Sequence, residues 1–437
     1  MRHSMRKYTL IILSLTLFCA NLFAILKGAD SWGKFINPFV ILISSYSICF
    51  TFFYALSRST PHARPAETPS ERTRSHLVSI GLCVASAVVI LPMFSDLLRT
   101  YSDPGCCSDV VPQLEALFKR FQKGEQPYYP LEKYSWHPFP VYMPLHWLPI
   151  GLGYLLRIDI RWVGVVFLFV AFYVWLSATG IRKVNPRIPV LRLLPAIVVI
   201  AFISWASTDI AVTFEVIIAA YYLLLGIGLE RNNMTLTTIG VIFCLLSRFT
   251  LIFWLPMFLV ILYLSTNRRT LFNVCVALSA AVLLIYVIPF LLRSPTIFAD
   301  GLKYHNLCYV NEWNGYGRPE HATAFDRGLN FSAYLRDFFA GTMTERVSAA
   351  RKVQAAVMIV LNIFAVYFYV RLKKKEHASK YLLALLYLTM MLFFLFSPHT
   401  YTYYYLECCM LSAVICASTI NNLMADHKLS GQESEPS

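Results

Sequence analysis

The sequence predicts an all-α protein that crosses a membrane about twelve times. Of its 437 residues, 57% are hydrophobic and only 14% are charged, and the mean hydropathy is +0.56. Soluble domains carry about 25% charged residues, so a chain this poor in charge is expected to lie in lipid. Apolar runs close to the roughly 20 residues that a span needs recur along the chain. We therefore expect one integral membrane domain over residues 1–437.

Twelve apolar segments account for the predicted spans. The first follows a basic N-terminus but has no small-residue cleavage site after it, so we expect it to remain as a helix. The predicted spans are 8–26, 35–56, 77–97, 161–180, 189–205, 209–229, 234–247, 249–265, 271–292, 350–371, 380–397 and 402–420.

Basic residues in the short loops predict the orientation of these spans, because cytoplasmic loops carry an excess of Lys and Arg. An internal N-terminus places the loops that contain Arg182 and Arg268 inside. It places loops 205–209 and 397–402, which have neither Lys nor Arg, outside. This holds only if the apolar segment 139–156 does not cross, since a crossing would invert every later loop. Its prolines favour a re-entrant or interfacial segment.

The same topology leaves both termini inside and two long loops outside. The first outer loop covers 98–160, including the re-entrant segment, and the second covers 293–349. We expect the polar segment 57–76 to be a cytoplasmic linker and 421–437 to be a cytoplasmic tail. The net charge of +14 is then explained by basic cytoplasmic loops, and no nucleic acid is expected as a partner.

The first outer loop contains a charged amphipathic helix within SDVVPQLEALFKRFQKGEQPYYP (108–130). Leu114 and Leu117 belong to a stripe of apolar residues at helical spacing, and Lys119 lies on the opposite face. Such a helix is expected to rest on the outer membrane surface, with its basic residues near lipid phosphates. Asp109, at its start, is either a helix cap or a functional carboxylate. A second surface helix is expected at 331–341 in the other outer loop.

The order of these features resembles the first outer loop of the GT-C class of glycosyltransferases, which use polyprenyl-phosphate sugars. Within this class, the features resemble those of glycosyltransferase family 87. Asp109 precedes Gly124 by fifteen residues, the segment YMPL at 142–145 resembles the family's Tyr-x-Pro-Leu element, and Ser397-Pro398 resembles its Ser-Pro element.

The chain also departs from the family pattern. Where the family often has a tryptophan and then a histidine after Ser-Pro, this chain has Tyr401 and Tyr403, with His399 instead. Arg248 stands where a lysine is common, and no Gly-Gln-x-Asn element is evident near residue 205.

The resemblance implies a GT-C-like fold and transfer of a sugar from a polyprenyl-phosphate donor to a membrane glycolipid or glycan acceptor on the outer face. The sugar would be a hexose, for example mannose, or a pentose. Phosphate is already a good leaving group, so the reaction needs a base for the acceptor hydroxyl and positive charge for the phosphate. Asp109 is the expected base and Asp103 the second candidate. We expect no cofactor and no metal, and we expect membrane lipids as further partners.

Ionisable residues near the outer ends of the spans are the next candidates, since such groups in membrane segments are functional by default. Arg248 lies in the turn LLSRFTLIF between two spans and is the candidate for holding phosphate. Glu215 and Glu407 are each expected about two turns into their helices from the same side. The alternative is a structural ion pair between Arg248 and one of these glutamates.

The outer loops supply the remaining candidates. The histidines, including His146, either bind phosphate or satisfy interfacial hydrogen bonds. The aromatic segment 303–321 offers Trp313 for stacking on a sugar, although an ordinary interfacial aromatic belt has a similar composition. The expected substrate-binding residues are Arg248, His399, Tyr403, His137, Tyr142, Glu215, Glu407, Trp313 and His305.

Three cysteines fall in the outer loops, in a compartment that is expected to be oxidising. A disulfide between Cys308 and either Cys106 or Cys107 would tie the two loops together, and free thiols are the alternative.

Two other classes of membrane protein fit part of this pattern. Twelve spans with both termini inside also suit a secondary transporter, although such proteins usually show related halves. A non-catalytic, flippase-like component of envelope glycan assembly would share the aromatic loops without depending on Asp109. In each case we expect a multi-pass protein of a bacterial plasma membrane, with the site facing outward.

Overall fold

The computed structural model describes residues 2–58, 69–106, 108–132, 137–178, 189–315, 328–372 and 377–425. Within these ranges the regular structure is helical and there is no strand, so the all-α prediction is confirmed. Six of the described helices are long and apolar enough to cross a membrane, or up to seven if one bent pair counts as a single span. The protein is therefore a multi-pass membrane protein by composition and helix length.

Each of the twelve predicted spans contains at least one described helix, but several of these helices are shorter than a bilayer crossing requires, so the count of twelve stays a prediction. In chain order they are α1 (Arg2–Phe23), α2 (Ala29–Arg58), α3 (Pro69–Thr100), α4 (Val110–Gln122), α5 (Pro144–Trp147), α6 (Gly151–Leu156), α7 (Arg161–Ala178), α8 (Leu194–Trp205), α9 (Ser207–Ala211), α10 (Glu215–Arg231), α11 (Met234–Leu245), α12 (Leu255–Ser265), α13 (Arg268–Val282), α14 (Ile297–Trp313), α15 (Ser332–Phe338), α16 (Met343–Leu372), α17 (Ala378–Leu395) and α18 (Leu406–Ala425).

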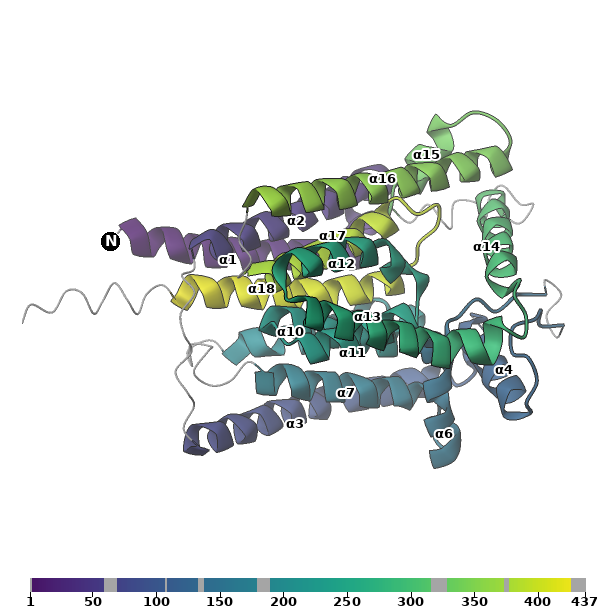
Figure 1. The fold of residues 1–437 in the computed structure, drawn as a ribbon, viewed down its shortest axis with the longest axis horizontal. Coiled ribbons are helices and arrows are strands. Elements are labelled where there is room, and N and C mark those ends of the chain that lie inside the picture. The colour runs from purple at the N-terminus through teal and green to yellow at the C-terminus, as the bar shows by residue number, and fades with distance from the viewer. Residues whose placement is uncertain are drawn as a thin grey trace, which may run out of the picture.

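Figure 1 shows the long helices running roughly parallel, with α4, α14 and α15 at the opposite end from the N-terminus. We call the end that carries these three helices the loop end. The two long connections predicted to lie on one side of the membrane are thus found at one end of the bundle. Which end faces outward stays a prediction from the basic loops.

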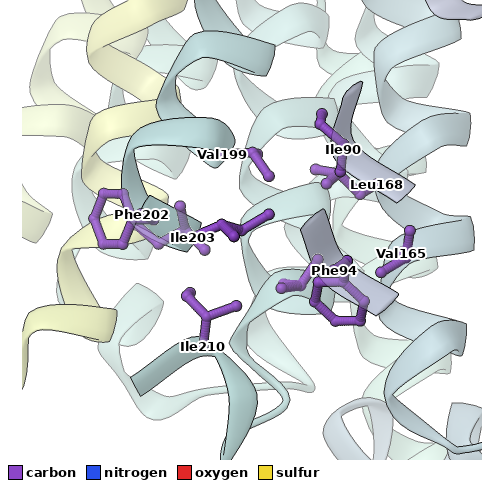
Figure 2. A pocket seen from close by; sticks show the side chains of 10 residues that line it. Ile90, Phe94, Val165, Leu168, Val199, Phe202, Ile203 and Ile210 are labelled. Atoms are coloured by element: carbon purple, nitrogen blue, oxygen red, sulfur yellow. The ribbon is translucent and has the colours of Figure 1, made fainter. Parts of the chain in front are cut away.

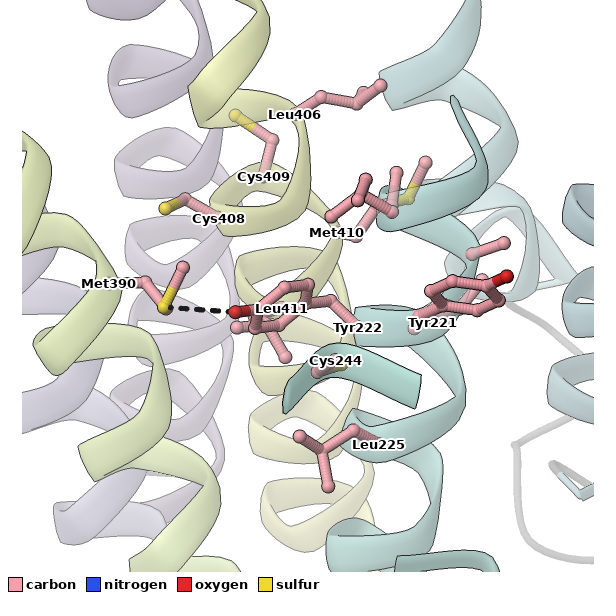
Figure 3. Close-up of a cluster of buried hydrophobic side chains, with 14 of the residues drawn as sticks. Tyr221, Tyr222, Leu225, Cys244, Met390, Leu406, Cys408, Cys409, Met410 and Leu411 are labelled. Carbon is pink, nitrogen blue, oxygen red and sulfur yellow. Dashed lines mark hydrogen bonds between the residues drawn. The ribbon is translucent and has the colours of Figure 1, made fainter. Parts of the chain in front are cut away.

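The centre of the bundle is formed by α10, α17 and α18. Of the most apolar windows of α17 and α18, 83% and 89% are buried inside the protein, against 22% for α3 and 17% for α16. The outer helices therefore present their apolar side chains to lipid, and the central ones pack against protein. Figure 3 shows this packing around Tyr222, whose hydroxyl donates a 3.4 Å hydrogen bond to the sulfur of Met390.

A buried polar network joins α1 to α2 and α17. The chain folds back at Gly33, whose φ of 76° favours glycine, and this brings α1 and α2 together. Asn21 donates to the hydroxyl groups of Ser44 at 2.8 Å and Ser45 at 3.0 Å, and the Tyr387 hydroxyl donates to Asn21 at 3.3 Å. Hydrogen bonds of this kind hold membrane helices together where the hydrophobic effect is absent.

Replacing Asn21 with alanine is expected to lower the free energy of unfolding by about 1 kcal/mol, because three hydroxyl groups lose a buried partner. The measurement is the thermal unfolding temperature of the detergent-purified protein. Ser57→Ala is the control, since the exposed Ser57 hydroxyl bonds only to the carbonyl of Tyr54 in its own helix. Equal melting temperatures for Asn21→Ala and wild type would contradict a stabilising role.

The helices of segment 139–156 form a sharp bend with α7, which fits either a re-entrant segment or a broken span, so the re-entrant assignment stays a prediction. These helices span about 13 residues from Pro144 to Leu156, a rise of about 20 Å against the roughly 30 Å of a hydrocarbon core. They lie at 108° to α7, and Figure 1 shows α6 pointing away from the bundle axis at the loop end.

Three predicted segments differ from the structure. The span 209–229 is broken after α9, where the Thr213 hydroxyl donates to the carbonyl of Asp209 at 2.6 Å, so Glu215 is the first residue of α10 and not two turns inside it.

The second outer loop contains an unpredicted helix, α14, as well as α15, which lies within the predicted 331–341 helix. The linker 57–76 is partly helical because α3 begins at Pro69. Residues 59–68 of it, and 426–437 of the tail, lie outside the described ranges.

Candidate functional site

Three charged side chains meet inside the loop end of the bundle. Arg248, in the turn before the 3₁₀ helix Phe249–Phe253, donates through Nη1 to Oε1 of Glu407 at 3.0 Å and through Nη2 to Oε1 of Glu215. The side chains of Arg248, Glu215 and Glu407 are 11%, 1% and 0% exposed. The structural ion pair considered from the sequence is thus present, and it involves both glutamates at once. We call these three residues the Arg248 centre.

The helix ends explain why two carboxylates are tolerated in this buried place. Glu215 is the first residue of α10 and Glu407 the second residue of α18, which corrects the expectation that both lie two turns into their helices. The N-terminus of a helix favours negative charge because its backbone dipoles and free N–H groups point there. When all three groups are ionised, the Arg248 centre has a net charge of −1, and its guanidinium is already engaged on both sides.

A run of tyrosines covers the Arg248 centre. The guanidinium of Arg248 lies 4.5 Å from the ring centroid of Tyr404, which sequence reasoning missed. Tyr403, which was predicted, packs against Tyr404 at 4.6 Å and stacks on Tyr401 at 5.1 Å. The sequence signal for Tyr404 is the run of three tyrosines at 403–405. The structure folds this run into the 3₁₀ helix Thr402–Tyr405, in which successive side chains point in different directions.

A histidine and a carboxylate form a second buried pair nearby. Nδ1 of His399 lies 2.8 Å from Oε2 of Glu312, and both side chains are nearly buried. The Tyr401 hydroxyl donates to Oε1 of Glu312 at 3.4 Å. Glu312 was missed by sequence reasoning, although Tyr309, Glu312 and Trp313 stand at positions i, i+3 and i+4 on one face of α14. A carboxylate held against Nδ1 fixes the orientation of an imidazole ring.

Trp313 holds the turn at Ser397-Pro398 in place. Its side chain is 4% exposed and its indole N–H donates to the carbonyl of Pro398 at 2.8 Å. The side-chain amide of Asn330 donates to the carbonyl of Ser397, also at 2.8 Å. The Ser397-Pro398 element is therefore held from two sides, and in this conformation the Trp313 ring is not exposed for stacking on a sugar.

Asp109 directly precedes α4, but its side chain makes no capping hydrogen bond. Its Oδ2 instead accepts from the amide of Gln113 at 2.8 Å, so the simple cap interpretation does not account for this carboxylate. Burial raises the pKa of the Tyr142 hydroxyl, the carboxylates of Asp109 and Glu215 raise this pKa further, and Arg248 opposes them. Tyr142 thus lies within electrostatic reach of both Asp109 and the Arg248 centre.

The other predicted residues lie further from this constellation. Asp103 is exposed and its Oδ1 accepts from the N–H of Gly105 at 2.9 Å, which is the role of a turn residue. His137 is also exposed and borders residues outside the described part. Burial lowers the pKa of His305 to about 4, and Arg351 and His399 lower it further, so His305 is neutral at pH 7 and close to both.

Two apolar hollows border these polar groups. One lies between residues 140–143 and α14, has a cavity volume of about 20 Å³, and includes Tyr128, Tyr286 and His305 among its lining side chains. The two walls approach closely, since a Cβ at Gly301 would come within 3.3 Å of Val141. The other has a cavity volume of about 10 Å³ among α3, α7, α8 and α9 and is lined by carbon alone in Figure 2. Its wall includes Val216 and Leu406, the sequence neighbours of Glu215 and Glu407.

The geometry bears on the hypothesis of a disulfide between the outer loops. Burial raises the pKa of the Cys308 thiol to about 11, a hydrogen bond from Tyr304 opposes this, and Glu312 and Asp109 raise it further. Asp109 is therefore near Cys308, and Cys106 and Cys107 precede Asp109 by three and two residues. The side chains of these two cysteines lie outside the described part, but Cys308 is a free thiol in this structure, which corresponds to the free-thiol alternative.

Because Cys308 is a free thiol in the structure, it is expected to react with a membrane-impermeant maleimide on intact cells without reduction, whereas a disulfide to one of the two neighbouring cysteines would require reduction first. Mass spectrometry of the labelled peptide is the measurement, and Cys308→Ser identifies its contribution. Full labelling of Cys106, Cys107 and Cys308 without reductant would eliminate the disulfide.

The loop end thus offers a carboxylate beside a phenol, a histidine–carboxylate pair and a buried arginine between two glutamates, with apolar hollows alongside. Among the described residues, no group of three or more His, Cys, Asp or Glu side chains lies close enough to hold a metal ion.

Comparison of the sequence and structure with protein-family models, curated proteins and solved structures finds no match.

Proposed function

We propose that the protein is a membrane glycosyltransferase that transfers a hexose or pentose from a polyprenyl-phosphate donor to a lipid-linked or glycan acceptor. It would be of the GT-C type, similar in its motifs to family 87, with its loop end on the outer face of a bacterial plasma membrane. One observation carries the proposal. The Asp109 carboxylate at the head of a surface helix caps nothing, and it lies near Tyr142 among buried polar groups.

In this mechanism Asp109 is the general base. The acceptor hydroxyl gives its proton to the carboxylate, and the acceptor oxygen forms a bond to the anomeric carbon. The bond from that carbon to the phosphate oxygen breaks, and the electron pair leaves with the phosphate. A single displacement of this kind inverts the anomeric centre. The bond from Gln113 to Oδ2 supports the role by orienting the carboxylate, so that Oδ1 faces the acceptor.

Lipid-linked substrates need apolar space beside this polar site. Two hollows lined mainly by hydrocarbon lie beside it, but their cavity volumes of about 10 and 20 Å³ hold about one water each, so a lipid-linked substrate requires the surrounding helices to move apart. Arg351 lies close enough to His305 to lower its pKa, so a cation stands near the polar end of the hollow against α14. That end is better suited to the donor phosphate than the Arg248 centre, whose guanidinium is already engaged by two glutamate side chains.

The buried Arg248 centre also favours a second candidate, a secondary transporter, because membrane-embedded carboxylates can carry exchangeable protons. Purified protein in liposomes separates the two. A transporter would accumulate free radiolabelled sugar when a proton gradient is imposed. A transferase would need no gradient and would leave free sugar outside. A flippase-like component would do neither, but would move polyprenyl-phosphate sugar across the bilayer.

The direct test supplies radiolabelled polyprenyl-phosphate mannose or arabinose to these liposomes, together with a lipid extract of the host membrane. The expected result is a new labelled glycolipid or glycan and release of free polyprenyl phosphate. Heat-inactivated protein is the control for non-enzymatic breakdown of the donor. Complete recovery of both donors, with extract from the native host present, would overturn the proposal.

A further inference from the structure

His146 is a buried histidine whose hydrogen-bonding capacity is unused. Its side chain is 0% exposed and neither ring nitrogen has a hydrogen-bond partner. The ring packs edge-on against Tyr142 at 5.0 Å and stacks near Phe214 at 6.2 Å. Its position is fixed, since the neighbouring residue Leu145 donates from its N–H to the carbonyl of Leu246 at 2.8 Å. That bond docks the segment on the turn that carries Arg248.

Two more polar atoms without partners lie in the Arg248 centre. Oε1 of each glutamate accepts from Arg248, but Oε2 of Glu215 and Oε2 of Glu407 have no hydrogen-bond donor. A buried polar atom without a partner costs about 1–3 kcal/mol, and native proteins contain few of them. Unmade bonds on three side chains around one arginine therefore mark a place that a polar ligand completes.

The chemistry of these atoms selects the class of ligand. Burial and the nearby Arg248 hold the pKa of His146 well below its usual range, so the imidazole is neutral. The guanidinium of Arg248 is already engaged by both glutamates, which disfavours binding of an anion such as phosphate there. Carboxylate oxygens accept hydrogen bonds from hydroxyl groups, and a neutral imidazole can both donate and accept. The aromatic rings of Tyr142, Phe214 and Tyr404 nearby suit the apolar faces of a sugar.

We propose that His146, Glu215 and Glu407 form the subsite that binds the sugar ring of the donor through its hydroxyl groups. This assignment rests on the proposed transferase function and divides its site in two. The sugar lies at the Arg248 centre, and the phosphate lies toward His305 and Arg351. The atoms are closed off in this structure, so binding requires the side chains around them to move apart.

The test compares wild type with His146→Phe, which keeps the ring and removes the two unpartnered nitrogens. Because an unsatisfied polar group disappears, the melting temperature of the variant is expected to be unchanged or higher. The probes are short-chain prenyl phosphates that carry mannose, arabinose or no sugar, and the measurement is the Kd of each. We expect wild type to bind one sugar-bearing probe about tenfold more tightly than the bare phosphate, a difference of about 1.4 kcal/mol. His146→Phe should bind all three equally.

Ser14→Ala is the matched control. It also removes a buried hydroxyl without a partner, but in α1, and it should keep the tenfold preference. The inference is overturned if His146→Phe keeps the preference, or if wild type binds the three probes equally, as expected when buried water alone fills the recess. Failure of the transferase proposal gives a different result. In that case wild type binds one sugar-bearing probe more tightly than the bare phosphate, but no sugar is transferred in the liposome assay.

Discussion

Replacing Asp109 with asparagine is expected to reduce sugar transfer about 100- to 10,000-fold, the range that general-base catalysis contributes. The amide retains the size of the carboxylate and an oxygen that can accept from Gln113, so the start of α4 should stay folded. It cannot take the proton of the acceptor hydroxyl at neutral pH. The measurement is the initial rate of label transfer from polyprenyl-phosphate sugar, with protein amount matched by size-exclusion chromatography.

Asp103→Asn is the matched control for this prediction. It makes the same chemical change six residues earlier in the same loop, at an exposed carboxylate that accepts from the N–H of Gly105. We expect its transfer rate to stay within about twofold of wild type, since exposed substitutions away from a site have small effects. If Asp109→Asn transfers sugar as fast as Asp103→Asn, the base is another group, and Glu312 with His399 becomes the next pair to test.

The parts of this site that sequence reasoning could predict are those with a local signal. Apolar residues at helical spacing mark α4, and the structure contains that helix with Asp109 at its head. Charged residues at the edges of apolar spans are rare enough to single out Arg248, Glu215 and Glu407. The sequence did not indicate that Arg248 pairs with both glutamates. Arg248 and Glu407 are 159 positions apart, and no local pattern specifies their contact.

The parts that sequence reasoning could not predict depend on contacts between distant segments. Glu312 accepts a hydrogen bond from Tyr401, which is 89 positions away in the sequence. Without knowledge of that contact, nothing distinguishes Glu312 from the other polar residues of its loop. The break before Glu215 has no proline or glycine to mark it, and the structure places there a bond from the Thr213 hydroxyl to the carbonyl of Asp209. That break matters, because it turns Glu215 from a residue inside a span into the first residue of α10.

Arg248→Met is expected to lower stability by about 3–5 kcal/mol, the cost of removing one partner from a buried ion pair. The substitution leaves Glu215 and Glu407 without a cation between them. Both side chains are almost completely buried. Fluorescence-detected size-exclusion chromatography and thermal unfolding should show little folded protein. Arg248→Lys should be milder but still impaired, because an ammonium group cannot bond both carboxylates in the planar arrangement that the guanidinium provides.

The triple variant Arg248→Met, Glu215→Gln, Glu407→Gln distinguishes unpaired charge from lost packing. Replacing a buried ion pair as a whole is often neutral, because the desolvation cost of the charges disappears with them. We therefore expect the triple variant to recover most of the melting temperature that Arg248→Met loses. If the arginine instead mattered through its packing against Tyr404, neutralising the glutamates would restore nothing. Recovery of folding in the triple variant would also allow an activity measurement without the ion pair. A folded but inactive protein would mean that the glutamates bind substrate as well as balance Arg248.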